Sequence, residues 1–304
     1  MTIRKQKTIL KPFIFSGVGL HSGQQCTVKV HPADVDHGVR FIATEDPFKT
    51  EVLVSHESLD GGTLGTNLLV DVYSIKTVEH FLAALCALEI DNLVVEVSGG
   101  EMPIQDGSSI EYLMLFEKAG IVSQDAGKTL NRLEREVSVA VDGKHFYITP
   151  RSDDKVVFDI KIDFDNNCVK KMPQSIIYTH TKENFMKHLA SARTFGFKRD
   201  LDYLLEKGLC LGGSLHNAIL FNEQDILNPE GLRFSNEIIA HKTLDIIGDL
   251  FPLINSTCGF TIEAFKPGHT LNSKALNEVM GKTKKQRVNT VRSSEAEMKV
   301  LEKE

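Results

Sequence analysis

The sequence predicts an α+β fold of two similar modules, each a sheet layered with helices, packed face to face with a functional site between them. Short alternating runs interrupted by glycine and proline fill residues 9–54, and a similar set fills residues 135–164, as expected for strands joined by turns. In each half a helical pattern is followed directly by an apolar strand, in residues 78–97 and in residues 240–265. The same order of elements occurs twice, which suggests an internal duplication.

The composition is typical of a globular protein. Hydrophobic residues make up 41% and charged residues 25% of the 304 positions, a length that suits one large domain or two ordinary ones. The net charge of −6 argues against nucleic-acid binding through bulk electrostatics. Five scattered cysteines without a CxxC pair indicate neither a disulfide framework nor a thiolate zinc site, and they suit a reducing compartment.

No segment has the pattern of a signal peptide or a membrane span. Residues 1–15 carry early positive charge but no continuous apolar stretch. The longest apolar run, residues 81–88, is far shorter than the roughly 20 residues that a spanning helix needs. We therefore expect a soluble, cytoplasmic protein without stable membrane insertion. We also expect a monomer.

The first module, residues 1–124, is predicted to pass from strands to helices. His21, in the glycine-rich stretch GVGLHSG, is interpreted as a turn histidine with local hydrogen bonds. Ser74 is a candidate N-cap for a helix over residues 74–92. A strand over residues 92–100, a tight loop over residues 101–109 and a helix over residues 110–119 complete the module.

The second module, residues 125–280, is predicted to begin at a polar connector, residues 123–131. Asp142 and Gly143, between two alternating runs, form a strong signal for a β-hairpin. The other expected elements are a strand over residues 155–164, helices over residues 181–192 and 237–253, and a strand over residues 259–265. A charged tail, residues 281–304, has little apolar periodicity and is expected to be flexible.

The helix predicted over residues 237–253 carries the first chemical signal. His241, Asp245 and Asp249 recur every four residues, so their side chains lie along one face of the helix. A buried or half-buried carboxylate one turn from an imidazole needs a proton, a cation or a metal as its partner. Gly248 lowers helix stability by about 1 kcal/mol relative to alanine, which predicts close packing against another backbone.

The helix predicted over residues 74–92 adds Glu79 and His80. If the modules pack face to face, His80 can join His241 and Asp245 in a set of two imidazoles and one carboxylate. Three protein ligands with an open fourth position are typical of catalytic zinc, and Glu79 would be the first candidate for a general base. The spacing also fits histidines satisfied within a core or a helical pair at the surface, and the zinc motif HExxH is absent.

Seven short stretches of the chain give a more specific signal, and they include parts of both histidine-bearing helices. They are GVGLHSG (17–23), TVEH (77–80), EMPIQDGS (101–108), ARTFGF (192–197), GLCLGGS (208–214), HKTLDIIGDL (241–250) and KPGHTLN (266–272). On these motifs the chain closely resembles the UDP-3-O-acyl-N-acetylglucosamine deacetylases, zinc-dependent amidases of bacterial lipid A synthesis. The resemblance implies a small-molecule substrate, an acylated UDP-sugar, whose N-acetyl amide is hydrolysed to acetate and the free amine.

The resemblance implies that Zn²⁺ is held by His80, His241 and Asp245. Zinc lowers the pKa of its bound water toward about 7, so hydroxide becomes available at neutral pH. In the same family pattern Glu79 corresponds to the general base. These are the residues that the helical spacing also selects.

Three further catalytic roles rest on the resemblance. His269 matches the protonated histidine that stabilises the oxyanion and protonates the departing amine. Asp249 matches the carboxylate that orients this imidazole and favours its charge. Thr194 matches the hydroxyl that donates a hydrogen bond to the oxyanion.

Substrate contacts are also implied by position. The matching residues are Lys242 and Lys266 near the sugar and diphosphate, Lys144 at a third lysine position, and Asp163 and Phe164 where the family binds uridine. For Lys144, Asp163 and Phe164, an exposed lysine or a core aromatic is an equal alternative. An apolar passage for the acyl chain is expected around Phe195 to Leu211, although its leucines also suit an ordinary core.

One stretch departs from the family. TLGTN, residues 63–67, lacks the cysteine that many relatives carry there, with Gly65 and Asn67 in its place. Because it contains no expected ligand or base, it leaves the assignment of activity unchanged. The alternatives are a zinc hydrolase of another N-acyl nucleotide sugar and a non-catalytic module that binds nucleotide-lipids.

Overall fold

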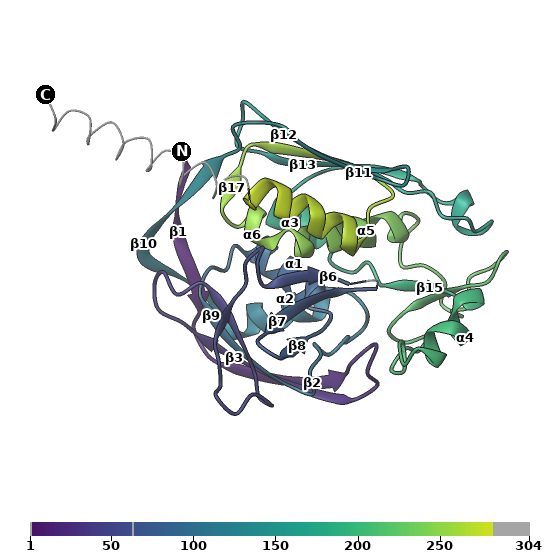
Figure 1. Cartoon of the computed structure of the whole chain (residues 1–304), viewed down its shortest axis with the longest axis horizontal. Helices are drawn as coiled ribbons and strands as arrows, with labels where there is room; N and C mark the ends of the chain where they lie inside the picture. Colours follow the sequence, from purple (N-terminus) through teal and green to yellow (C-terminus); the bar gives the residue numbers. More distant parts are fainter. Residues whose placement is uncertain (1, 63, 282–304) are drawn as a thin grey trace, which may run out of the picture.

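The computed structural model describes residues 2–62 and 64–281 (Figure 1). Each half of the chain contains a five-stranded sheet. The first sheet has the order β2-β3-β9-β4-β5 and the second has the order β11-β12-β18-β13-β14. The first comprises β2 (Phe13–Val18), β3 (Gln25–Pro32), β9 (Leu93–Ser98), β4 (Val39–Ala43) and β5 (Val52–Leu53). The second comprises β11 (Val137–Val141), β12 (Lys144–Pro150), β18 (Phe260–Phe265), β13 (Val156–Lys161) and β14 (Ser175–Thr179).

The two sheets pair their strands in the same directions. The central strand, β9 or β18, runs parallel to one neighbour and antiparallel to the other, and each remaining pair is antiparallel. The residues of the central strands that are buried alternate along the chain, so one face of each sheet packs on the core. They are Leu93, Val95 and Val97 in β9 and Phe260, Ile262 and Ala264 in β18. The predicted α+β class is confirmed, and the matching orders support an internal duplication.

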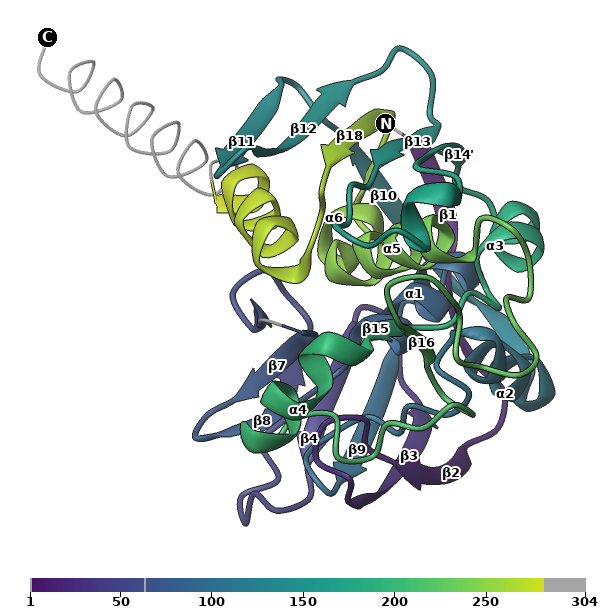
Figure 2. The same ribbon diagram turned by 90° about the vertical axis from the view of Figure 1, so that its right-hand side faces the viewer.

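A layer of helices lies between the two sheets (Figures 1 and 2). Its members are α1 (Glu79–Leu88), α2 (Ile110–Ala119), α3 (Lys182–His188), α5 (Glu237–Asp249) and α6 (Phe251–Ile254). Every residue of α1 and α5 is buried, and the two helices pack against each other. A methyl group at Gly248 of α5 would lie 2.0 Å from the backbone oxygen of Glu79 in α1. The predicted close approach at Gly248 is therefore confirmed.

The helix predicted over residues 74–92 is shorter than expected, and Ser74 is not its N-cap. Ser74 lies in β8 (Tyr73–Ile75), and α1 begins at Glu79 without a side-chain cap. The backbone before α1 is held by tertiary pairing, in which the Lys76 N–H donates to the carbonyl of Gly100. This pairing overrides the local capping signal.

The two helices predicted in the second half also differ in length from the observed ones. The helix expected over residues 237–253 is divided between α5 and α6 after Asp249. Pro252 lies in the first turn of α6 and has no N–H for a continuous helical ladder. The helix expected over residues 181–192 ends earlier, because α3 stops at His188.

The stretch predicted as a polar connector, residues 123–131, is part of a strand instead. β10 (Ile121–Arg132) pairs antiparallel with β1 (Thr2–Ile9), and its end runs parallel to β17 (Thr257–Cys258). Residues of β10 alternate between half-buried and exposed positions, since neither face of this ribbon is fully covered. A polar composition is therefore compatible with a strand here, and the ribbon connects the two halves.

Each half adds a smaller element beside the buried helices. The first half adds β6 (Leu59–Gly61) and β7 (Thr66–Val70), which form a three-stranded sheet with β8. The second half adds the parallel pair β15 (Phe195–Phe197) and β16 (Ile219–Phe221), the helix α4 (Lys198–Glu206) and a short 3-10 helix, η1 (Val169–Lys171). No residue of α4 is buried, so this helix lies on the surface (Figure 2).

Two further predictions concern the C-terminal tail and membrane-spanning helices. The charged tail predicted from residue 281 lies outside the described residues except for Gly281. Among the helices of residues 2–62 and 64–281, none has the length and apolar content needed to cross a membrane.

Candidate active site

Three predicted metal ligands converge where α1 meets α5. The Nε2 atoms of His80 and His241 lie 3.5 and 3.3 Å from Oδ1 of Asp245. One ligand atom from each residue lies within 4.8 Å of the others, and all three side chains are buried. The two imidazole rings meet edge to face with centroids 5.0 Å apart. The structure therefore brings His80 together with His241 and Asp245, which lie 161 and 165 residues later in the chain.

The chemistry of this donor set fits a divalent metal such as zinc. Oδ1 of Asp245 is buried without a hydrogen-bond partner in the described chain, while Oδ2 accepts a 2.7 Å hydrogen bond from Lys242 Nζ. Burial raises the pKa of Asp245, but His241 and Lys242 outweigh it and hold the pKa well below its usual range. The result is a buried anionic oxygen that lacks a cation at its free side.

His241 is held in the tautomer that a metal needs. Its Nδ1 lies 3.0 Å from the carbonyl of Ala192, which accepts the Nδ1–H and leaves the lone pair of Nε2 directed at the cluster. Burial lowers the pKa of His241 to about 3, despite the opposing effect of Asp245. The imidazole is therefore neutral at pH 7 and available as a ligand.

Glu79 lies beside these ligands in the first turn of α1. Its Oε2 accepts a 3.0 Å hydrogen bond from the backbone N–H of Thr66. The side chain is 2% exposed, and burial raises its pKa, with His269 and His80 acting in the opposite direction. A carboxylate with a raised pKa next to a metal site suits proton abstraction from water.

His269 forms a second carboxylate–imidazole pair next to the cluster. Its Nδ1 lies 2.9 Å from Oδ2 of Asp249, and its Nε2 lies 3.9 Å from Oδ2 of Asp245. Burial alone would lower the pKa of His269, but the Asp249 carboxylate raises it to about 9. His269 is therefore protonated at pH 7 and can donate a proton.

Thr66 and Asn272 also contact the site, and the sequence did not predict them. The Thr66 hydroxyl donates to Oδ1 of Asp249 at 2.6 Å, and Nδ2 of Asn272 donates to Oδ2 at 2.8 Å. Asn272 belongs to the KPGHTLN motif, three residues after His269, so that motif could have indicated it. Thr66 lies in TLGTN, residues 63–67, which contains no expected ligand or base, yet it contacts both Glu79 and Asp249.

The segment that contains Thr194 approaches the cluster from the second half. Thr194 is half-buried two residues after Ala192, whose carbonyl holds His241. Its own N–H donates to the carbonyl of Gly107, and its carbonyl accepts from Ile219. Both halves of the chain thus fix the backbone at Thr194.

The predicted substrate residues occupy two places. Lys242 is buried against Asp245, inside the cluster. Lys266 lies farther out, with Nζ 2.8 Å from Asp163 and 5.3 Å from the ring centroid of Phe265. Lys144 is exposed at the start of β12, and the register that pairs His145 with Phe265 places it next to Lys266.

Aromatic rings connect the outer group to the metal cluster. The centroids of Phe164 and Phe195 are 5.3 Å apart, and Phe195 lies 6.1 Å from the imidazole of His241. The leucines expected around an acyl passage lie in α4 or shortly after it, and two of them, Leu205 and Leu211, are 42% and 53% exposed. These two leucines are therefore not ordinary core residues.

Three motifs outside the cluster, residues 17–23, 101–108 and 208–214, are joined by hydrogen bonds. His21, expected to bond locally, is 6% exposed, and its backbone N–H donates to Glu101 at 2.8 Å. Glu101 also accepts from the backbone of Ser22, and the Gly212 N–H donates to the carbonyl of Leu20. The turn closes locally through the Gly23 N–H and the Gly19 carbonyl, but the hydrogen bonds of His21 go to residues distant in sequence, contrary to the local interpretation.

The chain matches one protein family over nearly its whole described length. The sequence profile of the UDP-3-O-acyl N-acetylglycosamine deacetylase family matches residues 6–281. A protein of Hahella chejuensis with the name UDP-3-O-acyl-N-acetylglucosamine deacetylase is 42% identical over 277 residues, covering 91% of this chain and 90% of the relative. A protein of the same name from Alcanivorax borkumensis is 40% identical, and the match covers 91% of this chain and 90% of the relative. Another from Psychrobacter sp. is 38% identical, and the match covers 90% of this chain and 92% of the relative. With a buried His-His-Asp cluster in the matched region, the chain belongs to the UDP-3-O-acyl N-acetylglycosamine deacetylase family.

Proposed function

We propose that this protein hydrolyses the N-acetyl amide of UDP-3-O-acyl-N-acetylglucosamine, the step of lipid A synthesis that the family resemblance implies. The observation that carries the proposal is the placement of Glu79 and His269 beside one His-His-Asp cluster. One of these groups is suited to accept a proton and the other to donate one. Amide hydrolysis requires both, because water must lose a proton and the departing nitrogen must gain one.

The proposed metal is zinc, held by His80, His241 and Asp245. Bound there, zinc would polarise the acetyl carbonyl and lower the pKa of the attacking water. Lys242 holds the second oxygen of Asp245 and the Ala192 carbonyl holds the Nδ1–H of His241. These contacts orient the ligands, as is usual for metal sites.

Proton transfer is assigned to the two flanking groups. Glu79 takes a proton from the attacking water as the oxygen–carbon bond forms. The protonated His269 and the Thr194 hydroxyl stabilise the negative charge that develops on the acetyl oxygen. His269 then gives its proton to the nitrogen as the carbon–nitrogen bond breaks, so that acetate and the free amine leave.

Substrate recognition is assigned to the residues outside the cluster. Lys266 and Lys144 would bind the diphosphate, with Asp163 beside them and the ring of Phe164 as a stacking surface for uridine. Phe195 connects this group to His241, in the direction that the sugar must follow. Lys242 would contact the sugar from within the cluster, and the acyl chain would pass along the leucines around α4.

The proposal extends to the setting of the reaction. All five cysteines are free, which suits the reducing cytoplasm, and we place the enzyme there. The first proposed module, residues 1–124, contributes Glu79 and His80. The second, residues 125–280, contributes the other catalytic and metal-binding residues: Thr194, His241, Asp245, Asp249 and His269.

Acetate release from UDP-3-O-acyl-N-acetylglucosamine tests the function directly. Protein stripped with a chelator is assayed before and after addition of one equivalent of zinc. Activity that returns only with the metal is the expected result. A folded, zinc-loaded protein that releases no acetate would contradict the proposal, and other N-acyl nucleotide sugars would be tested next.

A further inference from the structure

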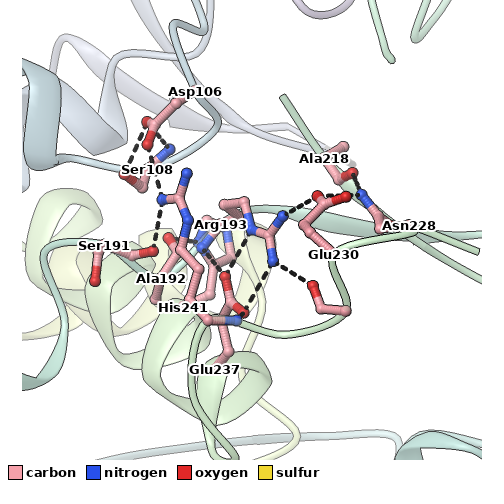
Figure 3. Close-up of polar contacts among 12 residues, drawn as sticks. Asp106, Ser108, Ser191, Ala192, Arg193, Ala218, Asn228, Glu230, Glu237 and His241 are labelled. Carbon is pink, nitrogen blue, oxygen red and sulfur yellow. Dashed lines mark hydrogen bonds and ion pairs between the residues drawn. The ribbon is translucent and has the colours of Figure 1, made fainter. Parts of the chain in front are cut away.

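Arg193 is a buried cation beside the metal cluster and has no role in the reaction described above. It is 2% exposed, and its guanidinium nitrogens donate to three groups (Figure 3). Nε and Nη2 donate to the two oxygens of Glu237 at 2.8 and 3.2 Å, Nη1 donates to Glu230 at 2.7 Å, and Nη2 also donates to the carbonyl of Gly231 at 2.8 Å. A buried charge with this many partners is held in one position.

Glu237 is the other half of the buried pair. It is 0% exposed and is the first residue of α5, where free backbone N–H groups favour a negative charge. Besides the guanidinium, it accepts from the backbone N–H of Arg193 at 3.1 Å and of Arg233 at 2.6 Å. It precedes His241 by four residues, so the two side chains lie on the same face of the helix.

A single peptide group connects this pair to the metal ligand. The unit between Ala192 and Arg193 donates its N–H to Glu237, and its carbonyl accepts from Nδ1 of His241 at 3.0 Å. Because the peptide unit is planar, fixing its N–H also fixes the direction of its carbonyl. Two side chains one turn apart on α5 thus hold opposite ends of one rigid group.

We infer that Arg193 and Glu237 are positioning residues that keep the Ala192 carbonyl aimed at Nδ1 of His241, and so keep Nε2 directed at the metal. The inference rests on the proposed function, because it requires that the cluster binds a metal. Among the described residues, no side-chain hydrogen bond joins the pair to His80 or Asp245, and the side-chain route from the pair to the His241 imidazole runs through this peptide group. Loss of such an outer partner weakens metal binding by about 10–100-fold in other metal sites.

Three variants test the inference by metal affinity, measured by competition between the stripped protein and a zinc chelator. The main variant is Arg193→Met with Glu237→Leu, since replacement of a buried ion pair by apolar residues of similar volume is often tolerated. Arg193→Lys keeps the charge but loses the fork that binds both oxygens of Glu237. Glu230→Gln is the matched control, because Glu230 is 53% exposed and contacts Arg193 only from the solvent side.

The expected result is a loss of about 10–100-fold in zinc affinity for the double variant, a smaller loss for Arg193→Lys, and none for Glu230→Gln. At saturating zinc, KM for the substrate should remain as in the wild type. A purely structural pair would instead lower the melting temperature of the metal-free protein and leave the zinc affinity of the folded fraction unchanged.

The outcomes separate this inference from the proposed function. Wild-type affinity in the folded double variant overturns the inference alone, as does an equal loss in Glu230→Gln. If the double variant does not fold, Arg193→Lys decides between the same two outcomes. A wild-type protein that takes up no zinc overturns the proposed function and the inference together.

Discussion

The two central helices occupy equivalent places in the repeated halves, yet they carry their polar groups differently. α1 has Glu79 and His80 in its first turn and an apolar remainder, whereas α5 distributes His241, Asp245 and Asp249 along its length. Both helices are wholly buried. Charge at the start of a helix lies near free N–H groups, but charge farther along needs partners from other segments. The two halves therefore share the arrangement of sheet and helix. They differ in the residues from other segments that pair with the charged side chains of α5.

Removal of the α1 carboxylate should have the largest effect and should separate the two helices functionally. Glu79→Ala is expected to lower turnover by about 10²–10⁴-fold, because the general base is lost. Zinc binding should persist, since His80 and both α5 ligands remain. Turnover and bound zinc are measured on the same sample.

The control for this change is Glu89→Ala, at an exposed position where α1 ends. Glu89→Ala should behave as the wild type in both measurements. Turnover of Glu79→Ala within a few-fold of the wild type would mean that α1 does not supply the base.

The second prediction concerns the acid that α5 holds. His269 must be protonated to donate, so activity should fall as pH rises through about 9. In Asp249→Asn the anion that raises this pKa is gone, and the alkaline limb should move to lower pH by about 1–3 units. The rate of acetate release is measured against pH.

The acid limb of the same profile provides the control. It reflects Glu79, which must be deprotonated to act and whose pKa is raised by burial, so activity falls as pH decreases. Asp249→Asn should move the alkaline limb much more than the acid limb. An alkaline limb that stays in place would remove His269 as the donor.

The third prediction tests the contact between the helices. Gly248→Ala places a methyl group against the backbone of Glu79 and should destabilise the protein by about 1–3 kcal/mol, as overpacking of a core does. Gly281→Ala is the matched change, since a methyl group there would meet no other atom of the described residues within 4 Å apart from its chain neighbours. The melting temperatures of the two metal-free variants are compared. Equal values would show that α1 and α5 can move apart without a loss of stability.

The smallest effect is expected at the rim of the second half. Lys266→Ala should raise KM by about five-fold or less, because a charge contact at a half-exposed side chain contributes up to about 1 kcal/mol. Its kcat should remain unchanged, since Lys266 Nζ pairs with Asp163 outside the His-His-Asp cluster. Lys187→Ala, at an exposed site on α3, is the control. A fall in kcat with unchanged KM would place Lys266 in the chemistry instead.

The sequence predicted the parts of the site that depend on one helix. The spacing of His241, Asp245 and Asp249 fixes their common face in any α-helix, and Gly248 indicated a backbone contact. Tertiary contacts were not predictable in this way. Thr66 bonds to a carboxylate 183 residues away, and no periodicity connects positions so far apart.

The fold was predictable to a similar extent. The hairpin at Asp142 and Gly143 and the helix at residues 110–119 formed as expected, because their signals are local. Ser74 lost its capping role to strand pairing, and residues 123–131 became a strand because their partner is β1. The buried pair of Arg193 and Glu237 was missed, since charged residues are usually exposed.

The position of β18 in its sheet has a consequence for folding during synthesis. β18 is the last strand of its sheet in sequence but the middle one in space. Until residues 260–265 leave the ribosome, β11 with β12 and β13 with β14 are two separate antiparallel pairs, and an isolated two-stranded pair is marginally stable. His269 follows β18 directly, so the second half and its catalytic acid should become ordered together, late in translation.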